Sequence, residues 1–404
     1  MIKLNYFLEK IKDVKPADYL SLFPMTAALI LRPFFIKKFK NTWLVCEEPF
    51  EARDNGYRFF KYMCENQPQQ KCFYAIKKDS VDYKKVKNLG EVIEHGSIKH
   101  WLAYFLCRYN ISSQKGGKPN AAVCSFMELN GRFKPKNVFL QHGIIINDLE
   151  WLYADRSCIK YFITSTIPEA KFIDSRFGYP RGTVRLTGMP RLDNLHDVKI
   201  SPRRILIMPT WRYWFNLKSK QNENTDSNFE TSEYLEKWLE ILSCQKMKDL
   251  IKKYNLDVVF YPHRNMQNHI DIFKKIDSPV TVASWEDYDI QELLKSSEMM
   301  ITDYSSVFFD MVYMKKLVIF YQFDEEKFRA NQYAEGYFDY NSTPFGKSFK
   351  NCSDVLSELE NIINSDFKVS DSYLAEHKKI FKYWDCKNSE RIFLMLSGGN
   401  KGRK

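Results

Sequence analysis

The fold is decided by the stretch Met299-Met300-Ile301-Thr302-Asp303-Tyr304-Ser305-Ser306, which continues into Val307-Phe308-Phe309-Asp310. Its first four residues predict a short buried strand, the next four a polar turn, and the residues from Val307 onward a helix with an apolar face. A strand that delivers two serines to a helix N-terminus can bind an anion, because unpaired backbone N–H groups and the helix dipole both favour phosphate. The alternative interpretation is that Asp303 or Ser305 only caps the helix, as such residues often do.

The composition indicates a folded, basic chain with an anionic partner. Its 404 residues allow two domains of ordinary size, and 44% of them are hydrophobic. The formal charge of +11 favours a nucleic acid, a membrane surface or a phosphorylated substrate, but no recognition motif supports binding to nucleic acid. The nine cysteines form no CxxC pair, which argues against a zinc site and a disulfide framework and favours a reducing, cytosolic setting.

Residues 1–40 predict a basic amphipathic segment that contacts a membrane. They hold eight Lys or Arg against three acidic residues, a net charge of +5, among bulky apolar side chains. This mixture suits the headgroup region of an anionic leaflet, and the alternative is a set of packing helices with a solvated basic face. No secretory signal is evident, and Pro24, Arg32 and Pro33 interrupt the apolar residues 20–36. We therefore expect no transmembrane helix, and a cytoplasmic protein peripheral on the inner face of the cell membrane.

From Thr42 onward, expected strands alternate with expected helices. The first series of strands covers 42–46, 71–76, 92–94, 138–140, 161–164 and 184–186, with helices over 56–64 and 99–109. The second series covers 205–208, 257–261, 280–283, 299–302 and 317–321. Such an alternation predicts parallel sheets wrapped by helices.

The polar run 196–202 separates the two series and places a domain boundary there. After the N-terminal segment, we expect a Rossmann-like domain over 41–198 and a second Rossmann-like domain over 199–385, followed by a C-terminal helix and basic tail over 386–404. The predicted class is α/β, with two doubly wound domains that face each other across a cleft and place the carboxyl ends of their strands toward the ligand.

Two of the seven histidines follow predicted strands. His142 lies in Gln141-His142-Gly143, and His263 follows Tyr261-Pro262. A histidine at such a strand end points into the crevice, where imidazole can take a proton from a hydroxyl or, when protonated, contact a phosphate. We predict that both are catalytic, the alternative being that each only makes structural hydrogen bonds.

Arginines and serines at other strand ends predict a pocket for a pyrophosphate. Arg212 follows Pro209-Thr210-Trp211, and Arg264 follows His263. A guanidinium can make a forked contact to a phosphate, although either arginine could be an ordinary surface residue. With Ser305 and Ser306 they would form a cationic, donor-rich pocket that needs no metal.

Eight blocks of the sequence occur in an order that one enzyme family shares. They are Glu51-Ala52-Arg53-Asp54-Asn55-Gly56-Tyr57, Gln141-His142-Gly143, Gly188-Met189-Pro190-Arg191-Leu192-Asp193, Pro209-Thr210-Trp211-Arg212, Pro262-His263, the stretch 301–310, Ile319-Phe320-Tyr321 and Gly336-Tyr337-Phe338-Asp339-Tyr340. Over roughly residues 42–346 the chain resembles the CDP-glycerol glycerophosphotransferases, which include teichoic acid primases and polymerases and their capsule relatives.

The resemblance implies a GT-B fold and an enzyme that moves glycerol phosphate from CDP-glycerol to a hydroxyl of a lipid-linked or saccharide acceptor, with release of CMP. The site as read from its residues requires no cofactor or metal. By this likeness His142 is the general base, and Asp303 orders the turn. The positions that match the donor's phosphate and nucleotide site are Thr210, Arg212, His263, Arg264, Asp303, Ser305 and Ser306. The acceptor-side positions are Arg53, Asp54, Asn55, Gln141 and Gly143.

The sequence departs from the family pattern around His142. The family usually has Trp before this histidine and Thr-Pro after the glycine, whereas here Gln141 precedes it and Ile144-Ile145-Ile146 follow. We expect these residues to line the acceptor side. Alternative functions are transfer of ribitol phosphate from CDP-ribitol, a GT-B glycosyltransferase or epimerase that uses a nucleotide sugar, and a basic protein that only docks on anionic lipid.

Overall fold

The computed structural model describes residues 15–129, 131, 133–198, 200–201, 203–216 and 229–398. Residues 1–14 of the predicted membrane-contact segment and 399–404 of the predicted basic tail lie outside the described residues. As far as it is described, the chain forms two compact units. The first consists of the described residues within Met1–Ile144, Leu149–Asn194 and Lys382–Lys404, and the second of those within Ile145–Asp148 and Leu195–Phe381.

The first unit is built around a parallel sheet. Its seven described strands lie in the order β3-β2-β1-β4-β5-β6-β7, and all neighbours pair in parallel. The strands are β1 (Trp43–Cys46), β2 (Cys72–Ile76), β3 (Val92–Glu94), β4 (Tyr109–Ser112), β5 (Asn137–Phe139), β6 (Ile159–Thr164) and β7 (Val184–Leu186).

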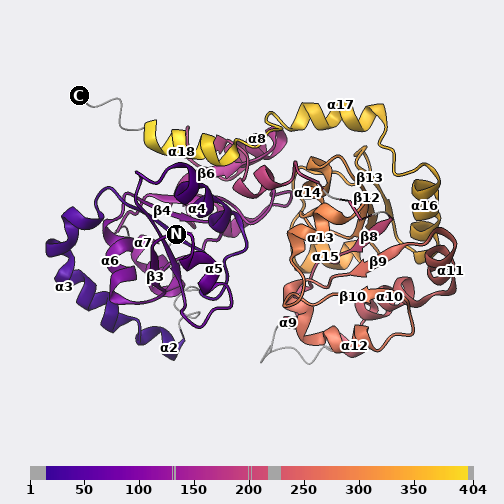
Figure 1. Cartoon of the computed structure of the whole chain (residues 1–404), viewed down its shortest axis with the longest axis horizontal. Helices are drawn as coiled ribbons and strands as arrows, with labels where there is room; N and C mark the ends of the chain where they lie inside the picture. Colours follow the sequence, from indigo (N-terminus) through magenta and orange to yellow (C-terminus); the bar gives the residue numbers. More distant parts are fainter. Residues whose placement is uncertain are drawn as a thin grey trace. The chain divides into compact units, whose positions relative to one another are not determined.

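Helices cover both faces of this sheet because successive side chains of each strand point to opposite faces. Trp43 and Val45 share one core with α4, α5 and α18, whereas Leu44 and Cys46 share another with α3, α6 and α7. Figure 1 shows α18, in yellow, lying beside α4 in this unit. The unit's helices are α2 (Pro16–Tyr19), α3 (Leu22–Phe39), α4 (Asn55–Asn66), α5 (Tyr83–Lys87), α6 (Ile98–Leu106), α7 (Ala121–Leu129), α8 (Ile167–Arg176) and α18 (Asn388–Gly398), with short 3₁₀ helices η1 (Glu150–Leu152) and η2 (Pro190–Asn194).

The second unit has the same kind of sheet. Its six described strands lie in the order β10-β9-β8-β11-β12-β13, again all parallel. They are β8 (Arg204–Ile207), β9 (Asp257–Phe260), β10 (Thr281–Val282), β11 (Met299–Thr302), β12 (Leu317–Tyr321) and β13 (Gly346–Phe349). The helices are α9 (Tyr213–Asn216), α10 (Glu233–Ser243), α11 (Gln245–Tyr254), α12 (Ile270–Lys274), α13 (Ile290–Ser296), α14 (Phe308–Tyr313), α15 (Glu325–Asn331), α16 (Cys352–Asn364) and α17 (Asp371–Ile380), with η4 (Phe229–Thr231) and η5 (Arg264–His269). The predicted α/β class with parallel sheets is thus confirmed.

Two strands correct the sequence prediction. The helix predicted over 99–109 ends as α6 at Leu106, and Tyr109–Ser112 forms β4 next to β1. The backbone turns extended at Cys107, and the Asn110 side chain donates to the carbonyl of Tyr104, which ties the new strand to the end of the helix. The prediction contained neither β4 nor the edge strand β13, because both are short and contain polar residues.

Helix α14 also differs from its prediction. It has six residues, and all of them are buried, so it has no polar face. Phe308 packs edge-on against Phe320 of the sheet and also contacts Phe338. A helix that is buried on all sides belongs in a core, and Asp310 is its one charged residue.

Helix α3 leaves several large apolar side chains at the surface. Within the described part of the chain, no helix combines the length and the apolarity that crossing a bilayer would take.

Candidate active site

Both sheets reverse their strand order at one point. In the first unit the reversal lies between β1 and β4, and in the second between β8 and β11. Open α/β sheets bind ligands beyond the carboxyl ends of their strands at such switch points. Glu47 follows β1 and Ser113 follows β4, whereas Thr210 lies beyond β8 and Asp303 follows β11.

In the first unit, His142 pairs with Asp54. His142 lies beyond the end of β5, and its side chain is 71% exposed. Its Nδ1 hydrogen-bonds to Asp54 Oδ2. Because a carboxylate only accepts, Nδ1 carries the proton and Nε2 keeps a lone pair with which it can take a proton from a substrate.

The charges around this pair favour an ionised carboxylate. Burial alone would raise the pKa of Asp54, but the His142 imidazolium and the Arg191 guanidinium bring it below its ordinary value. The Asp54 carboxylate in turn raises the pKa of His142. The pair therefore has the arrangement of a general base and the acid that orients it.

Arg191 holds the pair from a third block of the sequence. Its Nη1 lies 3.4 Å from Asp54 Oδ1 and donates to the carbonyl of His142. Asn55 completes the link, because its Nδ2 donates to the carbonyl of Gln141 at 2.9 Å and its Oδ1 accepts from the Arg191 N–H at 2.9 Å. Three blocks that are far apart in the sequence thus meet at His142.

Gln141 does not line an acceptor surface. Its backbone is left-handed (φ 66°), and its buried side chain donates inward to the Ile163 carbonyl and to Glu169 Oε1. The turn places Gln141 inside and His142 outside. Residues 144–146 are buried as well, which corrects the expectation that they line the acceptor side. Arg53 instead pairs with Asp82 at 3.1 Å.

In the second unit, Arg212 ties the switch point together. It is completely buried, and its guanidinium makes a forked contact to Asp324 at 2.8 and 2.9 Å. Its Nη2 also lies 2.8 Å from Asp303 Oδ2. The fork that we predicted for a phosphate is therefore directed at a carboxylate, because a buried guanidinium needs compensating negative charge. Asp303 and Asp324 raise the pKa of Arg212 although burial opposes this.

Asp303 orders the turn that follows β11. Its Oδ1 accepts from the backbone N–H groups of Thr210 and Tyr304, at 2.8 and 2.7 Å. Ser305 Oγ accepts weakly from the N–H of Val307 at 3.4 Å, but Val307 is itself the N-cap residue of α14, so this bond lies within the turn and does not cap the helix. The turn thus joins the loops beyond β8 and β11.

Hydroxyl groups are the donors that this turn offers to a ligand. The N–H groups of Phe308, Phe309 and Asp310 donate to carbonyls within the turn. Thr210 Oγ1 is buried and has no hydrogen-bond partner among the described residues. A buried hydroxyl normally has a partner, and this one lies at the switch point, next to the Asp303 turn.

His263 is better placed to donate a hydrogen bond to a phosphate than to act as a base. Its Nδ1 accepts from the N–H of Asn265 at 3.1 Å, which leaves the proton of the neutral ring on Nε2. The ring stacks on Trp211, with centroids 6.2 Å apart. Arg264 is exposed and lies over Trp285, 4.7 Å from the ring centre.

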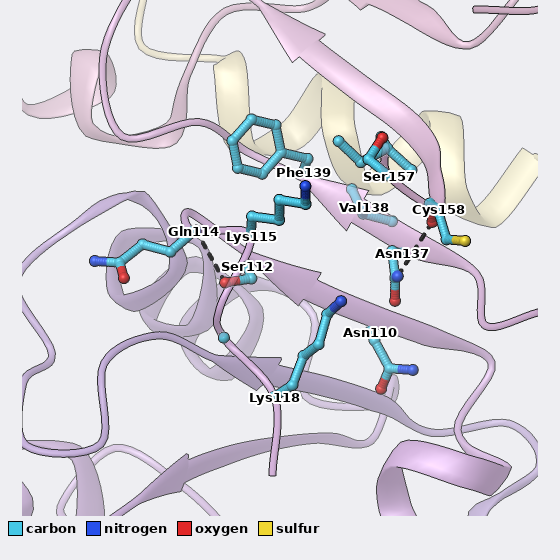
Figure 2. A pocket seen from close by; sticks show the side chains of 12 residues that line it. Asn110, Ser112, Gln114, Lys115, Lys118, Asn137, Val138, Phe139, Ser157 and Cys158 are labelled. Carbon is cyan, nitrogen blue, oxygen red and sulfur yellow. Dashed lines mark hydrogen bonds between the residues drawn. The ribbon is translucent and has the colours of Figure 1, made fainter. Parts of the chain in front are cut away.

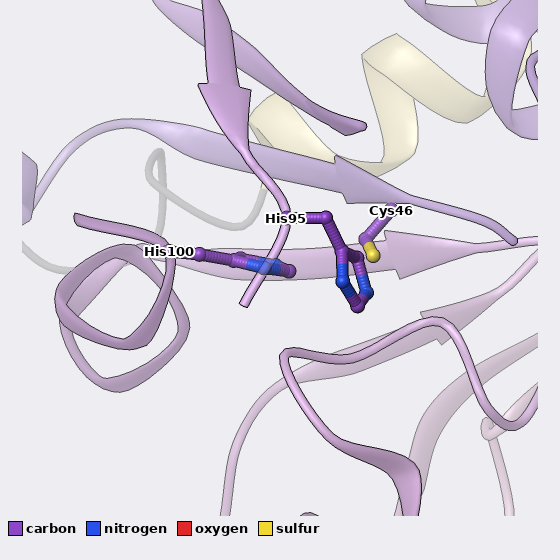
Figure 3. Close-up of side chains that lie close together, drawn as sticks. All are labelled: Cys46, His95 and His100. Atoms are coloured by element: carbon purple, nitrogen blue, oxygen red, sulfur yellow. The ribbon is translucent and has the colours of Figure 1, made fainter. Parts of the chain in front are cut away.

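A cysteine and two histidines lie together elsewhere in the first unit (Figure 3), with candidate ligand atoms of Cys46, His95 and His100 within 4.8 Å of one another. His95 could offer Nδ1, because its Nε2 lies 3.0 Å from the carbonyl of Lys118. His100 cannot offer Nε2, because its Nδ1 accepts from the Gly96 N–H at 3.0 Å and the proton is then on Nε2. The three residues as placed do not fit a metal.

A small cavity lined by both polar and apolar side chains also lies in the first unit (Figure 2). Its lining includes Asn110 and Ser112 of β4 and Asn137 of β5. Its volume of about 30 Å³ admits about one or two water molecules. Lys118, which also lines it, is neutralised by Glu128 at 2.6 Å. The predicted site residues do not contribute to its lining, so it is separate from the candidate site.

Sequence reasoning missed three residues that build this site. Glu47, Ser113 and Asp324 follow strands or precede helices, but their pairing depends on loops that meet only in the fold. Arg191 appeared only within the block 188–193. The available signal was a charged residue directly after a buried strand, and Glu47 fits it.

Comparison with known proteins places these observations in a family. The model of CDP-glycerol:poly(glycerophosphate) glycerophosphotransferases matches residues 27–397. The minor teichoic acid biosynthesis protein GgaB of Bacillus subtilis is 31% identical over 383 residues, covering 91% of this chain and 41% of GgaB. The teichoic acid ribitol-phosphate polymerase TarL of Staphylococcus aureus is 26% identical over 260 residues, covering 60% of this chain and 42% of TarL.

The chain therefore spans less than half the length of these relatives. Among solved structures, the wall teichoic acid polymerase TagF has the same fold, with a TM-score of 0.64 at 16% identity over 98% of this chain and 97% of that chain. A UDP-N-acetylglucosamine 2-epimerase of Listeria monocytogenes follows with a TM-score of 0.56 at 11% identity, over 91% and 98%. From the family match over residues 27–397, this chain belongs to the CDP-glycerol:poly(glycerophosphate) glycerophosphotransferase family.

Proposed function

We propose that the chain transfers glycerol phosphate from CDP-glycerol to a hydroxyl of a teichoic acid acceptor, lipid-linked or saccharide, and releases CMP. The observation that carries this proposal is the exposed imidazole of His142 with Asp54 on its Nδ1. Membership of the family supports the choice of donor. The GT-B arrangement, with two lobes facing across a cleft, is part of the proposal, since both units must act on one donor–acceptor pair.

In the proposed step, His142 Nε2 takes the proton of the acceptor hydroxyl. The acceptor oxygen attacks the β-phosphorus of CDP-glycerol, a new P–O bond forms, and the bond from that phosphorus to the bridging oxygen breaks. The electron pair leaves with CMP, and Asp54 stabilises the imidazolium until it returns its proton to solvent. Positioning and electrostatics supply most of the acceleration in such transfers.

The second unit is proposed to hold the donor phosphates by neutral hydrogen-bond donors. Thr210 Oγ1, the hydroxyls of Ser305 and Ser306, and His263 Nε2–H are the groups that support this assignment. Arg212 acts indirectly, because it holds Asp303 and the turn in place. Arg264 remains an exposed candidate for a charged contact.

CDP-ribitol is the second candidate donor. Ribitol-phosphate polymerases of Staphylococcus aureus are among the relatives, and one of them covers 60% of this chain. The described site contains no feature that we can assign to the length of the alditol. Product analysis with both donors decides between them.

We further propose that the protein is peripheral on the inner, anionic face of the cell membrane. Leu20, Phe23, Ile30 and Phe34 are 68–81% exposed on and before α3, and the same helix ends with Lys37 and Lys38. Exposed apolar side chains beside lysines suit the headgroup region. Phe34→Glu should release the protein from anionic phosphatidylglycerol vesicles in a sedimentation assay, and unchanged sedimentation would contradict this contact.

The test of the reaction is CMP release from CDP-glycerol with lipid-linked and oligosaccharide acceptors, combined with mass spectrometry of the product. His142→Ala should lower turnover by roughly 10²–10⁴-fold, the usual effect of losing a general base. CDP-glycerol affinity, measured by calorimetry, should remain nearly unchanged. Normal turnover of this variant would place the base elsewhere, and UDP release from a nucleotide sugar would favour the glycosyltransferase alternative.

A further inference from the structure

Asp54 occupies the N-cap position of α4, yet its side chain does not cap the helix. An N-cap aspartate usually accepts from the second or third N–H group of its helix, which in α4 belong to Gly56 and Tyr57. Here the carboxylate contacts His142 and Arg191 instead. The two N–H groups therefore need another acceptor.

Glu47 accepts from both N–H groups, and the Ser113 hydroxyl oxygen also accepts from the Gly56 N–H at 2.7 Å. Glu47 follows β1 and is 3% exposed. Its Oε1 accepts from the Gly56 N–H at 2.7 Å, and its Oε2 from the Tyr57 N–H at 3.1 Å. The hydroxyl of Tyr74 donates to Oε2 at 2.7 Å, and that of Ser113 donates to Oε1. The buried carboxylate is thus fully hydrogen-bonded, as a buried acid must be.

The close approach of Glu47 depends on Gly56. A Cβ at Gly56 would lie 2.7 Å from Glu47 Cδ, a distance that side chains do not tolerate. This glycine therefore allows the carboxylate of one strand to reach the first turn of a helix that follows later in the sequence.

We propose that Glu47 is a positioning residue for His142: by capping α4 in place of Asp54, it leaves the Asp54 carboxylate to hold the imidazole. This inference deepens the proposed function and rests on it for the role of His142 as the base. Without the Glu47 carboxylate, the Gly56 N–H keeps the Ser113 hydroxyl as an acceptor, whereas the Tyr57 N–H loses its acceptor. Asp54 is the residue placed to cap that group, and His142 then loses its partner.

The charges around His142 set its pKa, so a change in the position of Asp54 can be measured as a change in that pKa. Asp54, at the start of α4, raises the pKa of His142 most, Arg191 on η2 lowers it, and Glu47 after β1 raises it. The hydroxyl of Tyr74 on β2 donates a hydrogen bond to Glu47 Oε2. Burial and the neighbouring Asp54 raise the pKa of Glu47 to about 7, so replacing Glu47 by Gln removes a full negative charge only above this pH. The replacement also frees Asp54 to turn away. Both effects lower the pKa of His142, so the acidic limb of the rate profile moves to lower pH.

The experiment measures the pKa of His142 by NMR of the full chain with ¹³C-labelled histidine, alongside kcat against pH with CDP-glycerol. The variants are Glu47→Gln, which changes the capping group itself, and Gly56→Ala, whose Cβ would push the Glu47 carboxylate away from the helix. The matched control is Asp289→Asn, because Asp289 caps α13 through N–H groups at 2.8 and 3.3 Å in the second unit. Ser113→Ala removes one donor to Glu47 and the second acceptor of the Gly56 N–H, and it is the milder variant to use if Glu47→Gln does not fold.

We expect both cap variants to lower the pKa of His142 and to reduce kcat by up to about 10²-fold, the scale of a misplaced reacting group. In the Asp54→Asn background, Glu47→Gln should add little. The control should lower only the melting temperature. An unchanged pKa of His142 in the cap variants, or an equal fall in the control, would overturn the inference. A fall in the pKa in a chain that never releases CMP would refute the proposed function and leave the positioning by Glu47 standing.

Discussion

Replacing Arg212 by Met tests whether this arginine stabilises the fold or binds a phosphate of the donor. In the structure the guanidinium is fully buried and neutralises Asp303 and Asp324. Removing one partner of a buried ion pair usually costs about 3–5 kcal/mol, since the remaining charge stays buried without compensation. For a unit of this size, 1 kcal/mol corresponds to roughly 2–4 °C. We therefore expect the melting transition of the second unit to fall by about 6–20 °C.

The assay is differential scanning calorimetry of the full chain, with and without CDP-glycerol. Arg264→Met is the matched control, because this arginine was predicted for the same role but is exposed over Trp285. Such a surface change should stay within about 0.5 kcal/mol. Adding Asp324→Asn to Arg212→Met should recover part of the loss, since it removes one of the two stranded carboxylates.

The reasoning is refuted if Arg212→Met melts like the unaltered chain and binds CDP-glycerol much more weakly. That combination would mean that the guanidinium meets the donor and that its contacts to Asp303 and Asp324 contribute little to stability.

Two further changes test the site in each unit. Thr210→Val removes a buried hydroxyl without a partner among the described residues, so it should leave thermal stability unchanged or raised. If the hydroxyl binds a phosphate, titration calorimetry should show CDP-glycerol binding weakened by about 10–100-fold, as for a hydrogen bond to a charged group of about 1.5–3 kcal/mol; unchanged affinity would remove Thr210 from the donor site. Asp54→Asn removes the charge that raises the pKa of His142, so neutral imidazole persists to lower pH and the acidic limb of kcat/KM should shift downward. A shift to higher pH would contradict the sign of this interaction.

Much of the fold could be predicted because its strands are short apolar runs between polar turns. The bounds of β11, from Met299 to Thr302, and of β12, from Leu317 to Tyr321, agree with the sequence prediction. Strand β4 could not be found in this way, because Tyr-Asn-Ile-Ser has neither a clear apolar run nor a turn residue before it. Its place beside β1 is set by pairing with a strand that lies more than sixty residues earlier.

The candidate site was predictable only in part, and for a related reason. A histidine after a strand can be read from the sequence, so His142 could be proposed. Its partner could not, because Asp54 is 88 positions away and looks like an ordinary helix cap. Arg212 likewise looks like a phosphate ligand until Asp324, 112 positions later, is brought to it by the fold. The local sequence pattern shows which residue type stands at the end of a strand. The residue that this side chain contacts depends on how distant segments pack together in the fold.

Helix α18 has a consequence for the order in which the chain can fold. Asp193 caps it through the N–H groups of Asn388 and Ser389, at 2.8 and 2.9 Å, and Ile392 and Leu396 fill the core of the first unit. The second unit is nearly contiguous, from Leu195 to Phe381, and all of it precedes α18 in the sequence. The first unit therefore cannot complete its core around Trp43 until α18 has been made, which is after the residues of the second unit.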